Sequence, residues 1–146
     1  MKYKQTVEIE NICFEKATNE FKNINFVKFL TKLQPIKIIN WEGIKNNDEA
    51  FFKLWFFGWK NFKVKHINYK FNDKELTFID YGTELPFGLK SWEHKHILEN
   101  SRNGIRIIDS LKINHGKKII GLILYPILIF PIVTRKILYK IYFKNI

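Results

Sequence analysis

The sequence predicts an α+β domain made of one strand, two short helices, six further strands and a long C-terminal helix. Three observations support this prediction. The spacing of apolar residues changes from every second position to a helical period and back, turn-forming residues separate the later segments, and the chain from residue 117 onwards is apolar with a helical period. A chain of 146 residues can bury one substantial core, so we expect a single domain over residues 1–146.

The N-terminal part contains the first strand and both short helices. Residues 2–10 alternate polar and apolar side chains, which is typical of a strand. Apolar residues in 14–33 fall at helical spacings, and the sequence Asn-Ile-Asn at 23–25 divides this segment into two helices. The second helix should end at Gln34, because the residue before Pro35 disfavours the helical conformation.

Six strand-like segments come next. They cover residues 36–44, 49–58, 61–71, 75–81, 89–99 and 104–113. Turn-forming residues connect them, among them Asn72-Asp73 and the stretch from Asn100 to Gly104. Consecutive strands joined by short turns predict an antiparallel meander.

The C-terminal segment carries no charged residue from 119 to 134, and basic residues return at Arg135. This run is shorter than the roughly 20 apolar residues of a membrane span. We expect Pro126 and Pro131 to break it into a first segment and a final helix that begins near Pro131. Its apolar surface beside a basic end also suggests a transient contact with an anionic membrane surface.

The composition narrows the function classes. The formal charge is +11, but lysines are spread along the whole chain and only three arginines are present, without helix-turn-helix or zinc-finger spacing. We therefore favour solvated lysines over a nucleic-acid partner. The single cysteine, Cys13, cannot form an internal disulfide, and the first ten residues lack the apolar core of a signal peptide, so we expect a cytoplasmic protein.

The stretch Ser91 to Leu98 holds the most unusual pattern of the chain. Trp92, His94 and His96 occupy every second position of a predicted strand, so their side chains share one face. His66 and His115 have no evident partner and are not assigned a role.

Residues around this stretch resemble the SRPBCC superfamily of START-like and polyketide-cyclase-like proteins, in the branch with a Trp-x-His-x-His motif. The matching positions are Phe78, Asp80, Pro86, Phe87, Trp92, His94, His96, Gly104 and Asp109. Ile105 departs from the threonine that is usual in this branch. The resemblance implies the helix-grip fold, in which a seven-stranded antiparallel sheet wraps around the C-terminal helix and leaves an apolar cavity between them.

The last two strands should form a hairpin around residues 100–103. In the register we expect, Asp109 lies opposite His94 and Ile107 opposite His96. This cluster has four interpretations: a metal site, an acid-base dyad, a polar group that orients a ligand, or a structural hydrogen-bonded pair. Only Asp109 is available as a third metal ligand, so we predict no metal site and no cofactor.

We therefore predict a protein that binds a hydrophobic or amphipathic small molecule, lipid-like or polyketide-like, in the central cavity. The predicted ligand-binding residues are Phe78, Trp92, His94, His96, Leu98, Ile105, Ile107 and Asp109. One alternative is an enzyme of cyclase or dehydratase type that uses His94 and Asp109 as catalytic residues. Another is a membrane-peripheral protein anchored by its apolar C-terminal segment.

Overall fold

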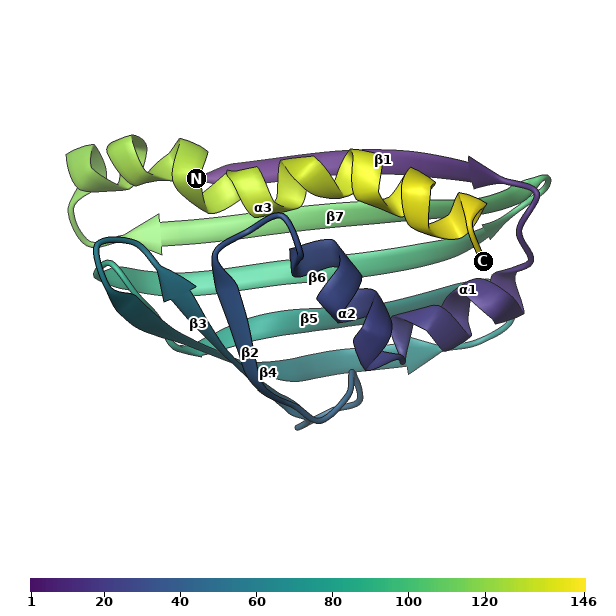
Figure 1. Ribbon diagram of the computed structural model, residues 1–146, viewed down its shortest axis with the longest axis horizontal. Helices are drawn as coiled ribbons and strands as arrows, with labels where there is room; N and C mark the ends of the chain where they lie inside the picture. Colours follow the sequence, from purple (N-terminus) through teal and green to yellow (C-terminus); the bar gives the residue numbers. More distant parts are fainter.

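The computed structural model describes all 146 residues and contains seven strands and three helices in the predicted order (Figure 1). The elements are β1 (Lys2–Glu10), α1 (Phe14–Phe21), α2 (Ile24–Thr31), β2 (Ile36–Trp41), β3 (Glu49–Trp55), β4 (Trp59–Phe71), β5 (Glu75–Glu84), β6 (Leu89–Ser101), β7 (Gly104–His115) and α3 (Lys118–Lys144). The predicted α+β class and the two short helices after the first strand are therefore confirmed.

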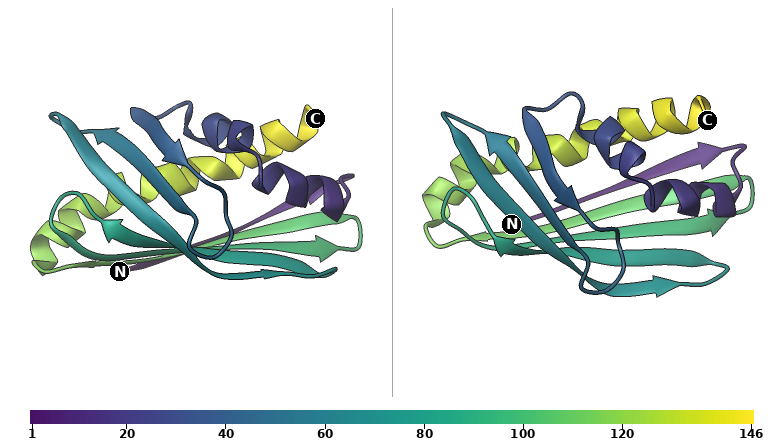
Figure 2. Two further views of the ribbon diagram at one scale, coloured as in Figure 1. Left: turned by 90° about the horizontal axis from the view of Figure 1, so that it is seen from below. Right: turned by 60° about the horizontal axis from the view of Figure 1, so that its bottom comes forward.

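All seven strands form one antiparallel sheet with the order β1-β7-β6-β5-β4-β3-β2. The six later strands form the predicted meander, and β1 pairs with the last strand rather than with its neighbour in sequence. The sheet is strongly curved, and all three helices lie on its concave side (Figure 2). Side chains on that face are therefore enclosed between the sheet and the helices.

The register of the β6–β7 hairpin differs from the prediction by two residues. His94 pairs with Leu111, and Asp109 pairs with His96. The turn is tighter than expected, because Ser101 already pairs with Gly104, which leaves two residues in the loop. A shift of two residues keeps every side chain on its predicted face, so His94, His96 and Asp109 still point to the concave side.

The predicted break of the C-terminal segment is wrong, since α3 is one continuous helix of 27 residues that includes Pro126 and Pro131. Each proline removes one backbone donor, and an interior proline costs a helix about 3 kcal/mol. Leu124, Leu128 and Ile132, spaced by four, bury the same face of α3 on both sides of the prolines. Packing against the sheet therefore keeps the helix continuous.

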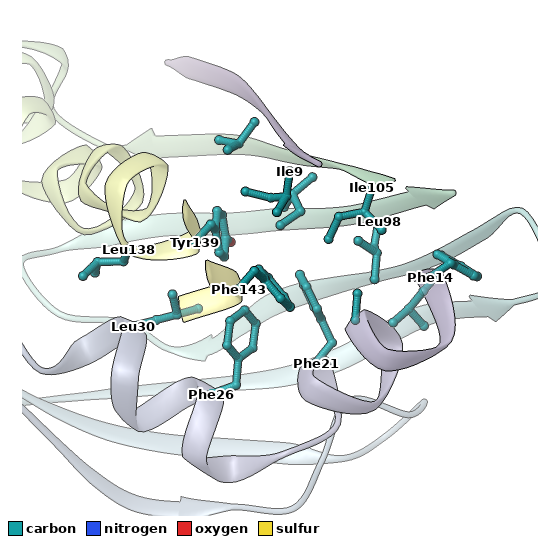
Figure 3. Packing of buried hydrophobic residues seen from close by; sticks show 14 of the residues in the cluster. Ile9, Phe14, Phe21, Phe26, Leu30, Leu98, Ile105, Leu138, Tyr139 and Phe143 are labelled. Carbon is teal, nitrogen blue, oxygen red and sulfur yellow. The ribbon is translucent and has the colours of Figure 1, made fainter. Parts of the chain in front are cut away.

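The core consists of two clusters of apolar side chains. In the larger cluster, α1 and α2 pack against the end of α3 and the sheet through Phe21, Phe26, Leu30, Tyr139 and Phe143 (Figure 3). The smaller cluster includes Trp92, Leu111, Leu124, Leu128 and Ile132, among others.

A belt of polar side chains separates the two clusters. On β6, His94 and His96 lie between Trp92 of the smaller cluster and Leu98 of the larger one. On β7, Asp109 similarly lies between Leu111 and Ile107. The polar residues of the sequence motif are thus in the middle of the concave face, where water has little access.

Candidate functional site

Strand pairing places the polar side chains in two rows that run across the sheet. One row contains His66 on β4, Asp80 on β5 and His94 on β6. The next row contains Phe78 on β5, His96 on β6, Asp109 on β7 and Gln5 on β1. Directly paired residues on one face of a sheet have their Cβ atoms about 5 Å apart, so the register alone brings these groups into contact.

Asp109 is the centre of the second row and is fully buried. Its carboxylate accepts hydrogen bonds from His94 Nε2 at 2.9 Å, Gln5 Nε2 at 2.9 Å and the Tyr139 hydroxyl at 3.2 Å. Arg135 Nη1 lies 3.9 Å from the same carboxylate. Burial would raise the pKa of Asp109, but the His94 hydrogen bond and the Arg135 charge outweigh burial and hold it below its usual range.

His94 is a neutral ring at physiological pH. Burial, and then the neighbouring His96 ring, lowers the pKa of His94 to about 4. Because Nε2 donates to Asp109, the proton of the neutral ring is on Nε2 and the Nδ1 lone pair is free. Nδ1 faces Asp80 Oδ2 at 3.7 Å.

Asp80 connects the other two histidines. His96 Nε2 donates to Asp80 Oδ2 at 2.8 Å, and His66 Nε2 lies 3.0 Å from Oδ1 in an ion-pair contact that is poorly aligned for a hydrogen bond. His66 Nδ1 donates to the backbone carbonyl of Asp48. Burial lowers the pKa of His66, but the Asp80 carboxylate and the Asp48 carbonyl outweigh burial and raise the pKa above its usual value, which favours the protonated ring beside Asp80.

Two residues of α3 complete the cluster from the opposite side. Arg135 and Tyr139 are one helical turn apart, so both side chains point towards the sheet. Tyr139 is fully buried, and burial followed by the Asp109 charge raises the pKa of its hydroxyl, which stays protonated as a donor. The Nε atom of Arg135 is buried without a hydrogen-bond partner.

Two cavities adjoin this polar cluster. The larger has a volume of about 250 Å³ and is walled mainly by apolar side chains, including Phe62, Trp92 and Leu128. The smaller, of about 70 Å³, is lined by Phe78, His96 and Tyr139 among others. Asp80 and Arg135 line both cavities. A wider surface depression around Asn11, Asn72 and Asn100 contains none of the clustered polar residues.

The predicted ligand-binding residues are therefore distributed over four environments. Trp92 and His94 line the larger cavity, and Phe78 and His96 line the smaller one. Asp109 lies behind the two histidines. Leu98, Ile105 and Ile107 are fully buried in the larger core cluster and line neither cavity.

Five members of the cluster were not among the predicted site residues: Gln5, His66, Asp80, Arg135 and Tyr139, although Asp80 is one of the positions that match the motif. The prediction that His66 has no partner is wrong, and its position opposite Asp80 could have been found only from the β4–β5 register. The prediction of no metal site rests on Asp109 as the only nearby carboxylate, and the structure adds Asp80, which lies with His94 and His96 as a group that can hold a metal ion. Arg135 offered one signal, since it is the first charge after the long apolar run.

No protein-family model matches the sequence, and no curated protein sequence is significantly similar to it. Several solved structures are similar in fold. The di-domain ARO/CYC StfQ from the steffimycin biosynthetic pathway has a TM-score of 0.67 at 8% identity over 99% of this chain, which spans 51% of that protein. Norcoclaurine synthase from Thalictrum flavum has a TM-score of 0.61 at 13% identity, with 96% of this chain and 90% of that chain covered.

A third similar structure is major latex-like protein 151 from Panax ginseng. Its TM-score is 0.56 at 15% identity, with 95% of this chain and 97% of that chain covered. At such low identities the similarity concerns the fold, and the curved sheet around α3 agrees with it. The chain therefore has the helix-grip fold, as the resemblance of the motif around Trp92 implied.

Proposed function

We propose that the protein binds a compact hydrophobic or amphipathic small molecule in the larger cavity between the sheet and α3. The observation that carries this proposal is an apolar cavity whose few polar lining groups include Asp80, His94 and Arg135. Ligand sites commonly have volumes of about 300–1,000 Å³, and this cavity, at about 250 Å³, is slightly smaller than that range. The volume favours a single ring system or a short chain over a two-tailed lipid.

The polar groups of the cavity suggest what the ligand carries. Arg135 Nε is a buried donor without a partner, and Gln34 Oε1 is a buried acceptor without a partner. Both residues line the larger cavity. An unpaired buried polar group costs about 1–3 kcal/mol, so a ligand with a carbonyl or hydroxyl group that satisfies them would gain affinity. Its apolar body would pack against Phe62, Trp92 and Leu128.

The mouth of the cavity adjoins the exposed apolar surface of α3. Ile127 and Phe130 line the cavity and are also exposed to solvent. By length and composition α3 could cross a membrane, and only 17% of its most apolar 18-residue window is buried. We infer that this surface touches an anionic membrane while an apolar ligand enters or leaves, and that the neighbouring lysines contribute electrostatic attraction.

A second candidate function is catalysis of the cyclase or dehydratase type. The observation that favours it is the neutral His94, whose Nδ1 is a free base beside the cavity while Nε2 is oriented by Asp109. In an enzyme, His94→Gln would reduce kcat far more than ligand affinity, whereas in a carrier it would alter affinity alone. Measuring the turnover of aromatic polyketide-like or aldehyde substrates by the unmodified protein and by His94→Gln separates the two functions.

Ligand binding can be tested with a fluorescent apolar probe and a matched pair of variants. Leu128→Trp fills the larger cavity from α3, and Leu122→Trp adds the same ring to an exposed position of the same helix. We expect probe binding to be lost in Leu128→Trp and kept in Leu122→Trp. Equal binding by both variants would show that the probe does not occupy the cavity, and native mass spectrometry of the purified protein would then identify any retained molecule.

A further inference from the structure

We propose that Asp80, His94 and His96 bind a divalent metal ion of the zinc class in the wall between the two cavities. One potential ligand atom from each residue lies within 4.8 Å of the others. Two imidazoles and one carboxylate are a donor set that suits zinc and related divalent transition metals. This inference is independent of the proposed ligand binding, since an apolar cavity can hold a molecule with or without a metal in its wall.

The spacing of the ligand atoms fits a metal of this size. Asp80 Oδ2 lies 3.7 Å from His94 Nδ1 and 2.8 Å from His96 Nε2. Zinc bonds to nitrogen and oxygen of about 2.0–2.2 Å require neighbouring ligand atoms of a tetrahedral site to be about 3.4 Å apart. The two observed distances bracket this value, and all three ligand atoms lie within 4.8 Å of one another, so side-chain rotations would have to close the site around the metal. The metal would take the place of the proton that His96 Nε2 now donates to Asp80, and the neutral ring would then carry its proton on Nδ1, which faces Asp109.

The outer shell of the site is already built. Metal-binding histidines usually donate their other ring nitrogen to a carboxylate, which fixes the tautomer and the ring orientation. Asp109 Oδ1 lies 2.9 Å from His94 Nε2 and 3.6 Å from His96 Nδ1, so one oxygen faces the outer nitrogen of both rings. Gln5 and Tyr139 hold this carboxylate in place with hydrogen bonds.

The carboxylate of Asp80 is also oriented by a neighbouring side chain. His66 contacts Oδ1 at 3.0 Å, which leaves Oδ2 directed at the two ligand histidines. The three ligands are on the adjacent strands β5 and β6, and Asp80 and His94 are direct cross-strand partners. Their backbone positions are therefore fixed by the sheet, and little ordering entropy would be lost on binding.

The site has three protein ligands and faces open space. Asp80 and His94 line the larger cavity, and Asp80 and His96 line the smaller one. A fourth coordination position would therefore be available to water or to a polar group of a molecule in the cavity, which is the arrangement of an open rather than a structural zinc site.

The proposal can be tested without any variant by adding metal to chelator-treated protein. We expect one Zn²⁺ per chain by calorimetry, and Co²⁺ should give the intense visible absorption of a four- or five-coordinate site. With ¹⁵N-labelled histidine, Zn²⁺ should shift the NMR signals of His94 Nδ1 and His96 Nε2. Weak absorption typical of hydrated Co²⁺, or signal changes confined to His115, would overturn the proposal.

Variants then identify the ligands. Asp80→Asn and His96→Gln should each weaken Zn²⁺ binding more than 100-fold, and Asp109→Asn should weaken it by about 10–100-fold because it acts through the histidines. His115→Gln, which changes a histidine outside the cluster, should leave binding unchanged. Circular dichroism shows which variants fold, and if neither Asp80→Asn nor His96→Gln does, the stoichiometry and NMR signals of the unmodified protein decide. Binding of the apolar probe by metal-free protein would show that ligand binding stands even if the metal site fails.

Discussion

His94 Nε2 donates to Asp109 Oδ1 at 2.9 Å, although the two residues are not cross-strand partners. His94 pairs with Leu111 and Asp109 pairs with His96, so the hydrogen bond runs diagonally across the hairpin. Asp109 can therefore face both histidine rings at once, while Asp80 faces them from the other side. This diagonal arrangement turns two pairs into one connected cluster, whose stability depends on each carboxylate.

Removal of the Asp109 carboxylate should destabilise the fold strongly. In Asp109→Ala, the donors of Gln5, His94 and Tyr139 lose a buried partner, and Arg135 loses its nearest counter-charge. Breaking a buried charge network of this kind costs about 3–5 kcal/mol. We expect this decrease in the free energy of unfolding, measured by urea denaturation.

The matched control is Glu8→Ala, which removes an exposed ion pair with Arg106. Exposed pairs contribute less than about 1 kcal/mol. If both variants lost the same small amount, the buried cluster would contribute nothing specific to stability.

The metal-free protein should lose stability as the pH falls from 6.5 to about 4. In this range the unfolded chain protonates His94, but burial and the neighbouring His96 keep the ring neutral in the folded protein, since its pKa is about 4. The shift corresponds to a loss of about 3 kcal/mol across the window. His66 has a raised pKa, so its stabilising contribution is fully present below pH 6.5 and does not change in this range.

Chelator-treated protein should be unfolded with urea at several pH values to measure this loss. His94→Gln should flatten the curve between pH 6.5 and about 5, above the range in which carboxyl groups such as Asp109 contribute to acid destabilisation, whereas His115→Gln should retain the slope. A slope that survives in His94→Gln would assign the acid sensitivity to other groups.

The architecture could be predicted well from the sequence, because the order of strands and helices depends on local patterns such as the spacing of apolar residues. Alternation along residues 89–99 and 104–113 sets which side chains face the helix, and a two-residue error in register does not change those faces. The partners within the site were harder to predict. His66 meets Asp80 only through the β4–β5 pairing, and Arg135 and Tyr139 reach Asp109 only through the packing of α3 on the sheet.

The two prolines of α3 show a second case in which a prediction from local sequence failed. Local rules predict a helix break, but burial of one face on both sides of Pro126 outweighs the cost of the missing hydrogen bond. Pro126→Ala should therefore stabilise the protein, because it restores a backbone donor at an exposed position within a continuous helix. We expect a gain of about 2 kcal/mol in the free energy of unfolding, measured by thermal unfolding, after the greater freedom of the unfolded chain is subtracted from the helix gain. A loss of stability in Pro126→Ala would instead show that the helix is interrupted there in solution.

The exposed face of α3 should govern association with anionic vesicles. Ile123 and Ile137 are 67% and 66% exposed, so replacing either with Asp should change the free energy of unfolding by no more than about 0.5 kcal/mol. In flotation with phosphatidylserine-containing vesicles at low salt, we expect the double variant Ile123→Asp, Ile137→Asp to lose most of its association. A carboxylate in the interface opposes both apolar insertion and attraction to anionic lipid.

Ile39→Asp is the matched control, because Ile39 is 49% exposed and belongs to β2 rather than to α3. Ile39→Asp changes the net charge by the same amount as each substitution on α3. If only net charge mattered, Ile39→Asp would therefore lose about half as much vesicle association as the double variant. Retained binding by Ile39→Asp together with loss in the α3 variant would assign the contact to the helix. Equal binding by all three proteins would mean that lysines scattered over the surface hold the vesicle, and the apolar face of α3 would then have no part in membrane contact.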